Sequence, residues 1–253
     1  MMTQMGLDKC PPFISSQMQP NAASPPTSGG RGRRLAITIS RQTGCGAHIV
    51  GERVAQHLQL RFPDETRPWA VFDRNLVEKV LDDHNLPRRL ERFMPEDKRS
   101  EFTDVLEELL GTHPPYWTLI RHTSETILRL ADRGNVIIIG RAANIITRGL
   151  DYAFHVRLVG SLEKRLAHVQ QVTGLDRNAA LDYIRKEDRG RQRYLKKYFE
   201  ADLDNSLLYH LVINTDLVSY DRAAAMITDG ALDRFYKLNP SPERRATDVS
   251  AFY

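Results

Sequence analysis

Short runs of apolar, β-prone residues recur along this chain, and helical patterns separate them. This alternation constrains the fold most, because strands separated by helices build a mostly parallel sheet with helices on both faces. The β-prone runs are residues 35–39, 70–73, 136–139, 152–159 and 211–215. Helical patterns cover residues 49–60, 75–83, 87–131, a stretch opened by Ser161, 178–198 and 219–238. We therefore predict an α/β fold with a mostly parallel sheet.

Composition excludes several classes of protein. The chain has 253 residues, of which 41% are hydrophobic and 27% charged, a balance typical of a globular domain. The longest apolar runs, such as Val136–Ile139, fall far short of the roughly 20 residues that a membrane span needs. Residues 1–30 lack the charged-then-apolar pattern of a signal peptide, and two cysteines build no disulfide framework. We expect a cytoplasmic protein with no membrane partner.

The two ends of the chain differ from its middle. Residues 1–33 are rich in Pro, Ser and Gly without an apolar period, which predicts a disordered tail. Residues 239–253 are turn-rich and polar, which predicts a second tail. The α/β domain would span residues 34–238, with residues 87–131 as a helical insertion.

The net charge is mildly basic. The chain carries 36 Lys and Arg against 32 Asp and Glu, for a formal charge of +4, and the sequence pI is about 9.1. This excess suits partners that carry phosphate, but most charges can cancel locally. Nucleic acid is therefore not expected as the main partner.

The stretch from Ser40 to His48 joins the first β-prone run to a helical pattern through two glycines. Glycines allow a sharp turn and a close approach to a ligand, and the start of the next helix presents unpaired N–H groups to an anion. The sequence predicts either a phosphate-binding loop or a plain strand-to-helix turn. The residues predicted to bind a phosphorylated cofactor are Ser40, Thr43, Gly44, Cys45, Gly46, Ala47 and His48.

The loop departs from the strict P-loop pattern at three positions. Arg41 stands in place of the first glycine, Ala47 in place of the lysine, and His48 in place of the hydroxyl residue that binds magnesium. Arg41 carries a permanent charge and could replace part of that of the missing lysine. A surface arginine beside a turn is the alternative.

Several segments together resemble the cytidylate kinase-like family, relatives of the nucleoside monophosphate kinases. The resemblance covers roughly residues 35–235. It rests on the loop Ser40–Gly46, on Asp73-Arg74 after the second run, on Ile139–Ile146 with its Gly140-Arg141 pair, on Asp188–Tyr194, and on Asn214-Thr215. It implies a P-loop kinase fold and phosphoryl transfer from ATP to a nucleoside monophosphate, CMP or dCMP first, with ATP and Mg²⁺ as cofactors.

The resemblance also implies roles for individual residues. Arg41, Arg141, Asp188 and Arg191 would be catalytic, and Asp73, Arg74, Arg141 and Arg185 would bind the acceptor. Residues 178–200 would form a basic lid helix whose arginines close over the phosphates. For Arg141 the alternative is a structural salt bridge, for Asp73 a structural role, and for the lid a solvated helix face.

Two further functions remain compatible with the sequence. Bona fide cytidylate kinases have an aspartate after the Gly-Arg pair, and this chain has Ala142 there. A catalytically inactive module that binds a nucleotide or phosphate is therefore the second hypothesis, and a nucleic-acid protein that uses the basic helix is the third.

Cysteine and histidine give weaker signals. Cys45 is either a small loop residue or a reactive thiol at the start of a helix. The histidines lack the close spacing of a metal site, so no side chain is predicted to bind metal. The oligomeric state is not predicted.

Overall fold

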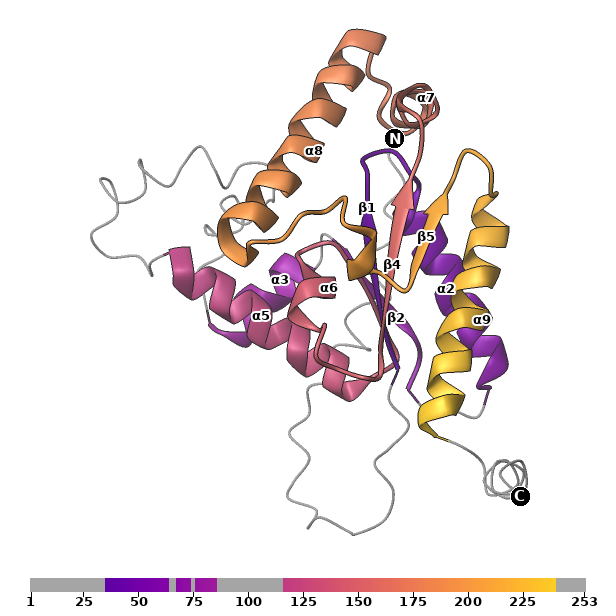
Figure 1. Cartoon of the computed structure of the whole chain (residues 1–253). Helices are drawn as coiled ribbons and strands as arrows, with labels where there is room; N and C mark the ends of the chain where they lie inside the picture. Colours follow the sequence, from indigo (N-terminus) through magenta and orange to yellow (C-terminus); the bar gives the residue numbers. More distant parts are fainter. Residues whose placement is uncertain (1–34, 64–66, 74–75, 86–115, 240–253) are drawn as a thin grey trace.

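Five parallel strands form one sheet in the order β2-β3-β1-β4-β5 in a computed structural model of the chain (Figure 1). The structure describes residues 35–63, 67–73, 76–85 and 116–239. The strands are β1 (Ala36–Arg41), β2 (Ala70–Phe72), β3 (Val136–Ile139), β4 (Ala153–Val159) and β5 (Leu211–Asn214). Each lies on a run that the sequence predicted, and the predicted α/β fold with a parallel sheet is confirmed.

Seven α-helices accompany the sheet within the described residues. They are α2 (Ala47–Arg61), α3 (Leu76–Asp83), α5 (Tyr116–Arg133), α6 (Ala143–Ile146), α7 (Leu162–Thr173), α8 (Arg177–Phe199) and α9 (Tyr220–Leu238). Helices α2 and α9 cover one face, whereas α3, α5 and α6 lie on the other (Figure 1). Helices α7 and α8 stand beyond the ends of the strands. None of the described helices has the length and apolarity that crossing a bilayer requires.

Two apolar clusters, one on each face, explain why the sheet lies between two layers of helices. Alternate β1 residues point to opposite faces, so Ile37 and Ile39 pack with α2 and α9, whereas Ala36 packs with Ile127 of α5. Each fully buried aliphatic side chain contributes about 1.5–3 kcal/mol. Apolar side chains on both faces of β1 are therefore covered by helices, and the sheet is buried on both faces, as parallel sheets usually are.

The expected insertion and tails fall largely outside the described residues. The structure does not describe residues 1–33, 87–115 or 240–253. The remaining part of the expected insertion, residues 116–131, belongs to α5. Leu130 and Ala131 of this helix pack against the sheet, so α5 is part of the layer that covers it.

Helix starts differ in a way that matters for the site. Ser161, predicted to open a helix, accepts a hydrogen bond from the Lys164 N–H at the start of α7, which confirms the prediction. Ser219 caps α9 in the same way. Helix α2 instead follows Gly46 in a left-handed conformation, without a side-chain cap and without an acidic residue in its first turn. Its first N–H groups therefore point toward the carboxyl edge of the sheet without a side-chain acceptor.

A buried histidine makes the stability of the sheet depend on pH. His155 of β4 is 5% exposed, and its Nδ1 lies 2.9 Å from Thr38 Oγ1 of β1. Burial, with smaller effects of His210 and Arg234, lowers the pKa of His155 to about 4. The neutral form is therefore the one that the fold accommodates.

We expect the free energy of unfolding to fall as the pH drops from 6.5 toward 4. In this window the unfolded chain binds a proton at residue 155 and the folded chain does not, a difference worth about 3 kcal/mol at most. Thermal denaturation between pH 7.5 and 4.5 measures it, with His155→Gln flattening the acid side of the profile. His57→Gln, on α2, is the control. An unchanged profile in His155→Gln would contradict the assignment.

Candidate functional site

The glycine loop between β1 and α2 is shaped by its neighbours in the protein. Gly44 and Gly46 have φ angles of 90° and 69°, in the left-handed region that favours glycine. A Cβ atom at Gly44 would lie 2.5 Å from the Arg165 carbonyl oxygen, and one at Gly46 would lie 2.4 Å from Cζ of Tyr220. Both glycines are thus required by close packing against α7 and α9.

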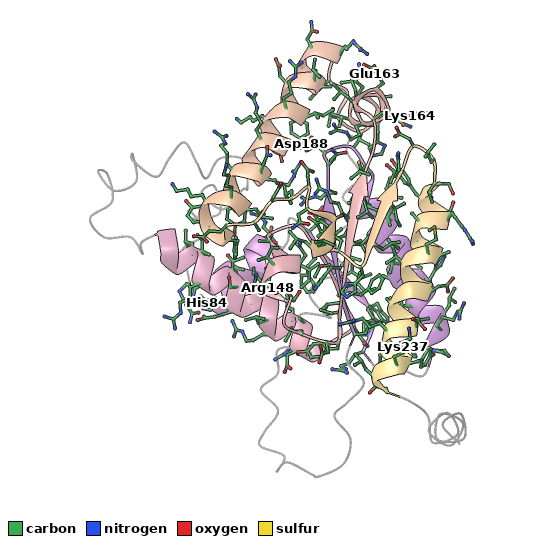
Figure 2. The ribbon with its side chains drawn as sticks, viewed as in Figure 1. His84, Arg148, Glu163, Lys164, Asp188 and Lys237 are labelled. Carbon is green, nitrogen blue, oxygen red and sulfur yellow. The ribbon has the colours of Figure 1, made fainter. Side chains whose placement is uncertain are left out.

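The side chain of Asp188 holds helix α8 onto this loop. Its Oδ1 accepts hydrogen bonds from the N–H and the Oγ1 of Thr43, both at 2.8 Å. Its Oδ2 accepts a hydrogen bond from Arg165 at 2.7 Å, and Arg191 donates to Oδ1 and approaches Thr43 Oγ1. Figure 2 shows Asp188 on the side of α8 that faces the strands. One carboxylate therefore gathers donors from the loop, α7 and α8.

The environment of Asp188 favours its charged form. Burial raises the pKa of this carboxyl, but the hydrogen bonds from Thr43 and the charges of Arg191 and Arg165 outweigh burial and lower the pKa below its usual value. A set of donors arranged around one carboxylate is also suited to a phosphate oxygen. Asp188 thus occupies an anion position at the loop, and the Thr43 amide is already capped by the protein itself.

A small cavity lies between the end of β1 and α8. Its volume is about 110 Å³, and its charged lining consists of Arg41, Arg157, Arg189, Arg191, Asp188 and Asp204. Arg41 Nη2 also lies 3.8 Å from Asp73 Oδ1, so the acceptor candidate Asp73 has an arginine partner at the same edge. Four arginines and two carboxylates thus line the cavity, and Arg191 Nη1 also lies 3.3 Å from Glu187 Oε2.

The loop residues predicted from the sequence are brought together, but in different environments. Ser40 is buried, and its Oγ accepts a hydrogen bond from Arg157 at 3.1 Å. Gly46 and Ala47 are buried beneath their neighbours, whereas His48 is exposed at the start of α2. Of the predicted loop residues, His48 is thus exposed, Thr43 and Gly44 are half-buried, and the others are buried.

Arg141 lies in a strained turn next to the loop. Gly140, Arg141 and Ala142 have φ angles of 79°, 58° and 57°, three consecutive left-handed residues after β3. Non-glycine residues adopt this region at a cost, and such turns cluster at functional sites. The register of β1 with β3 puts Ile139 beside Ile39, so Arg141 follows the same edge. Arg141 is nevertheless buried and does not line the 110 Å³ cavity.

The arginines of α8 divide between two faces. Arg185, Arg189 and Arg193 form the predicted row at i+4 spacing, and all three are exposed. Of these only Arg189 lines the cavity. Arg191, on the neighbouring face, is 5% exposed and contacts the loop. Arg74 lies outside the described residues.

Sequence reasoning missed two arginines and one aspartate of the site. Arg157 of β4 and Arg165 of α7 are both buried and both bind groups of the loop or of β1. Asp204 accepts a hydrogen bond from Arg157 at 2.7 Å. An arginine inside the β-prone run Ala153–Val159 was the available signal, since a buried strand tolerates a charge only when the fold supplies partners.

Two histidines far apart in sequence come together away from the loop. His84, which directly follows α3, and His122 of α5 have ring centroids 3.8 Å apart and ring planes tilted by 35°, and with Glu125 they place candidate ligand atoms within 4.8 Å of one another. Sequence spacing did not predict this proximity. Arg129 Nη2 lies 3.2 Å from His84 Nε2, so a ring nitrogen that could bind a metal already has a donor beside it. The cluster is explained as a contact between two helices.

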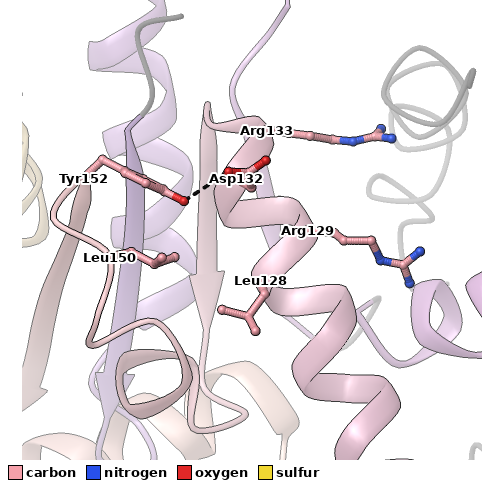
Figure 3. A pocket seen from close by; sticks show the side chains of 6 residues that line it. All are labelled: Leu128, Arg129, Asp132, Arg133, Leu150 and Tyr152. Carbon is pink, nitrogen blue, oxygen red and sulfur yellow. Dashed lines mark hydrogen bonds between the residues drawn. The ribbon is translucent and has the colours of Figure 1, made fainter. Parts of the chain in front are cut away.

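A larger cavity of about 450 Å³ lies at the opposite edge of the sheet. It is lined by residues that precede β3 and β4, among them Asp132 and Tyr152, whose hydrogen bond measures 3.3 Å (Figure 3). Ligands of open α/β sheets bind beyond the carboxyl ends of the strands. The loop and the 110 Å³ cavity lie at that end, so they form the candidate site.

The class of protein is an α/β fold, with a parallel five-stranded sheet, a glycine loop after β1 and an arginine-bearing helix packed onto that loop. The sequence model of the cytidylate kinase-like family matches residues 36–217, and the chain belongs to this family. No curated protein matches the chain.

Solved structures give similar folds at low identity. An uncharacterised protein from Eubacterium ventriosum is 19% identical with a TM-score of 0.56, covering 78% of this chain and 97% of that one. A shikimate kinase from Bacteroides thetaiotaomicron is 12% identical with a TM-score of 0.41, covering 82% and 99%. A gluconokinase from Sinorhizobium meliloti is 13% identical with a TM-score of 0.39, covering 81% and 94%.

Replacing Asp188 by Asn should release α8 from the loop. The loss of the charge breaks the ion pairs of Asp188 with Arg191 and Arg165, and we expect the free energy of unfolding to fall by about 1–3 kcal/mol. Amide hydrogen exchange over residues 40–48 should become faster. Asp182→Asn, exposed on the same helix, is the control. Unchanged exchange in Asp188→Asn would show that the carboxylate does not hold the loop.

Cys45 should be an unreactive thiol. It is 1% exposed, and burial, opposed by a hydrogen bond with Thr215, raises its pKa to about 11. In a Cys10→Ser variant, where Cys45 is the remaining cysteine, iodoacetamide at pH 8 should label the unfolded chain readily and the native chain at least about a hundredfold more slowly, because thiolate is the reactive form. Rapid labelling of the native protein would support a reactive cysteine instead.

Proposed function

We propose that this protein transfers a phosphoryl group from ATP to a nucleoside monophosphate, with CMP or dCMP as the first acceptor. The observation that carries the proposal is the meeting of Thr43 and Arg191, which brings the glycine loop and the lid helix together beside a cationic cavity. Phosphoryl transfer depends chiefly on positioning and on positive charge around the phosphates. Membership of the cytidylate kinase-like family supports the same reaction class.

The described residues suit phosphate groups. The uncapped start of α2 and the side chain of Thr43 would hold the donor phosphates, and Arg41 and Arg191 would contribute charge where the usual lysine is replaced by Ala47. Arg141 and Asp73 would bind the acceptor at the same edge of the sheet, together with Arg74 and Arg185 as the sequence predicts. These roles are hypotheses for mutagenesis.

The described side chains around the loop do not form a ligand set for Mg²⁺. Asp188 is engaged by four donors, Asp73 lies beside Arg41, and His48 replaces the usual hydroxyl. Mg²⁺ commonly keeps several waters and binds substrate phosphates. The roles proposed for the side chains therefore do not depend on a protein ligand for this ion.

The chemical step needs no covalent intermediate. An oxygen of the acceptor phosphate forms a bond to the γ-phosphorus of ATP as the bond between that phosphorus and the β,γ-bridging oxygen breaks. ADP leaves with the electron pair, and the acceptor becomes a nucleoside diphosphate. Arg191 would stabilise the charge that spreads over the transferring group, and closure of α8 would exclude water. If the Thr43 amide is to bind a phosphate oxygen of the donor, its hydrogen bond to Asp188 must first break.

One observation favours a second function, that of an inactive nucleotide- or phosphate-binding module. The Thr43 amide is bonded to the protein's own carboxylate, and the P-loop lysine position holds Ala47. Such a module would bind nucleotide without turnover.

Measurement of ADP release with CMP, dCMP and UMP as acceptors tests the proposal. We expect turnover with CMP or dCMP, and a loss of about 10³-fold in kcat in Arg191→Ala, by analogy with other arginines that stabilise the transferring phosphoryl group. Arg193→Ala, exposed on the same helix, is the matched control and should retain turnover. Tight nucleotide binding without turnover on any acceptor would favour the inactive module.

A further inference from the structure

Arg157 is a buried arginine that the proposed chemistry leaves without a role. It lies on β4 directly beside Ser40 of β1, and its side chain is 6% exposed. Its Nη1 donates a hydrogen bond to Ser40 Oγ at 3.1 Å, and its Nη2 donates one to Asp204 at 2.7 Å. Its guanidinium carbon also lies 5.8 Å from the centre of the Tyr209 ring. These contacts fix the guanidinium against the end of the sheet.

The partner that neutralises Arg157 lies largely in water. The side chain of Asp204 is 68% exposed, although the guanidinium that it binds is buried. Ion pairs with an exposed member contribute little to stability, so such a carboxylate can be exchanged for another anion at small cost. Burying the guanidinium is therefore not explained by the ion pair alone.

The same guanidinium lines the 110 Å³ cavity with three other arginines. Arg41, Arg189 and Arg191 face that space together with Arg157, and Asp188 and Asp204 are the two acidic residues there. Asp188 is already held by Thr43, Arg165 and Arg191. Arg41 also pairs with Asp73, and Arg191 also pairs with Glu187. Four guanidiniums around one small cavity nevertheless place many N–H donors where an anion can accept from them.

The size of the cavity limits what it holds. Pockets for whole small molecules occupy about 300–1,000 Å³, so 110 Å³ accommodates one charged group and not a complete nucleotide. A phosphate monoester could place its terminal group in this space while the rest of the molecule extends outward. A guanidinium binds such a group through two parallel hydrogen bonds.

We infer that Arg157 forms the floor of an anion subsite for a phosphate monoester, and that Asp204 occupies the guanidinium until the ligand displaces it. The subsite is distinct from the amides at the start of α2, because its anchor is a side chain of β4 fixed by Ser40. The assignment of the bound group to the phosphate of the acceptor nucleotide rests on the proposed function. Binding of the anion itself does not.

Because Asp204 would compete with the ligand for Arg157, replacing Asp204 should strengthen phosphate binding. Isothermal titration of the full chain with inorganic phosphate, and separately with CMP, should show binding about fivefold tighter in Asp204→Asn than in the wild type, because the competing carboxylate loses its charge. Asp233→Asn, exposed on α9, changes the net charge equally and should leave affinity within about twofold of the wild type. Weaker or unchanged phosphate binding in Asp204→Asn would overturn the inference, since Asp204 would then only anchor Arg157.

Arg157→Gln provides the complementary measurement. It should weaken phosphate and CMP binding at least about tenfold, since the charged donor is lost, while circular dichroism and thermal denaturation report whether the variant folds. Should that variant unfold, Asp204→Asn decides the question. If the protein turns over CMP but both variants bind phosphate with wild-type affinity, the subsite is refuted and the proposed function is not. The expected binding changes without turnover would support the subsite and refute the kinase activity.

Discussion

The carboxylate of Asp188 is the interaction on which the arrangement of the site depends. It accepts hydrogen bonds from Thr43, Arg165 and Arg191 and so connects the glycine loop, α7 and α8. The loop lies far from the two helices in the sequence. Without that charge Arg165 would lose the carboxylate that it binds here, and Arg191 would keep Glu187 as an ion-pair partner. Helix α8 is therefore positioned by an anion. The same donors suit a phosphate oxygen, so a bound phosphate would use the hydrogen bonds that now hold α8 on the loop.

The site combines packing constraints with polar chemistry. Gly44 and Gly46 are left-handed where Arg165 and Tyr220 approach the loop closely, and His48 is the exposed residue in the first turn of α2. The consecutive left-handed residues Gly140–Ala142 bend the chain away from β3 at the neighbouring edge. Both turns end parallel strands at one edge of the sheet, which is where an open α/β sheet has room for a ligand.

Local patterns in the sequence predicted much of the framework. The β-prone run Leu35–Ile39, the β-branched run Val136–Ile139 and the cap at Ser161 all depend on neighbours within a few residues, and all were predictable. The arginine row of α8 shows the limit. Spacing predicted that Arg185, Arg189 and Arg193 share a face, yet it is Arg191 that meets the loop. Which face of a helix turns inward depends on how the helix docks, and the apolar residues Ile184 and Leu195 of α8 are buried in that docking.

The sequence by itself determined the alternation of strands and helices, the position of the glycine loop and the family resemblance, because these follow from local propensity and from contiguous motifs. Only the tertiary structure decided that Arg157 and Asp204 belong beside Ser40, that Asp188 caps the Thr43 amide, and that His84 meets His122. Those contacts join residues 38 to 145 positions apart along the chain. The energies of these contacts depend on how distant segments bury and pair their charges. The spacing of residues within one segment does not predict that.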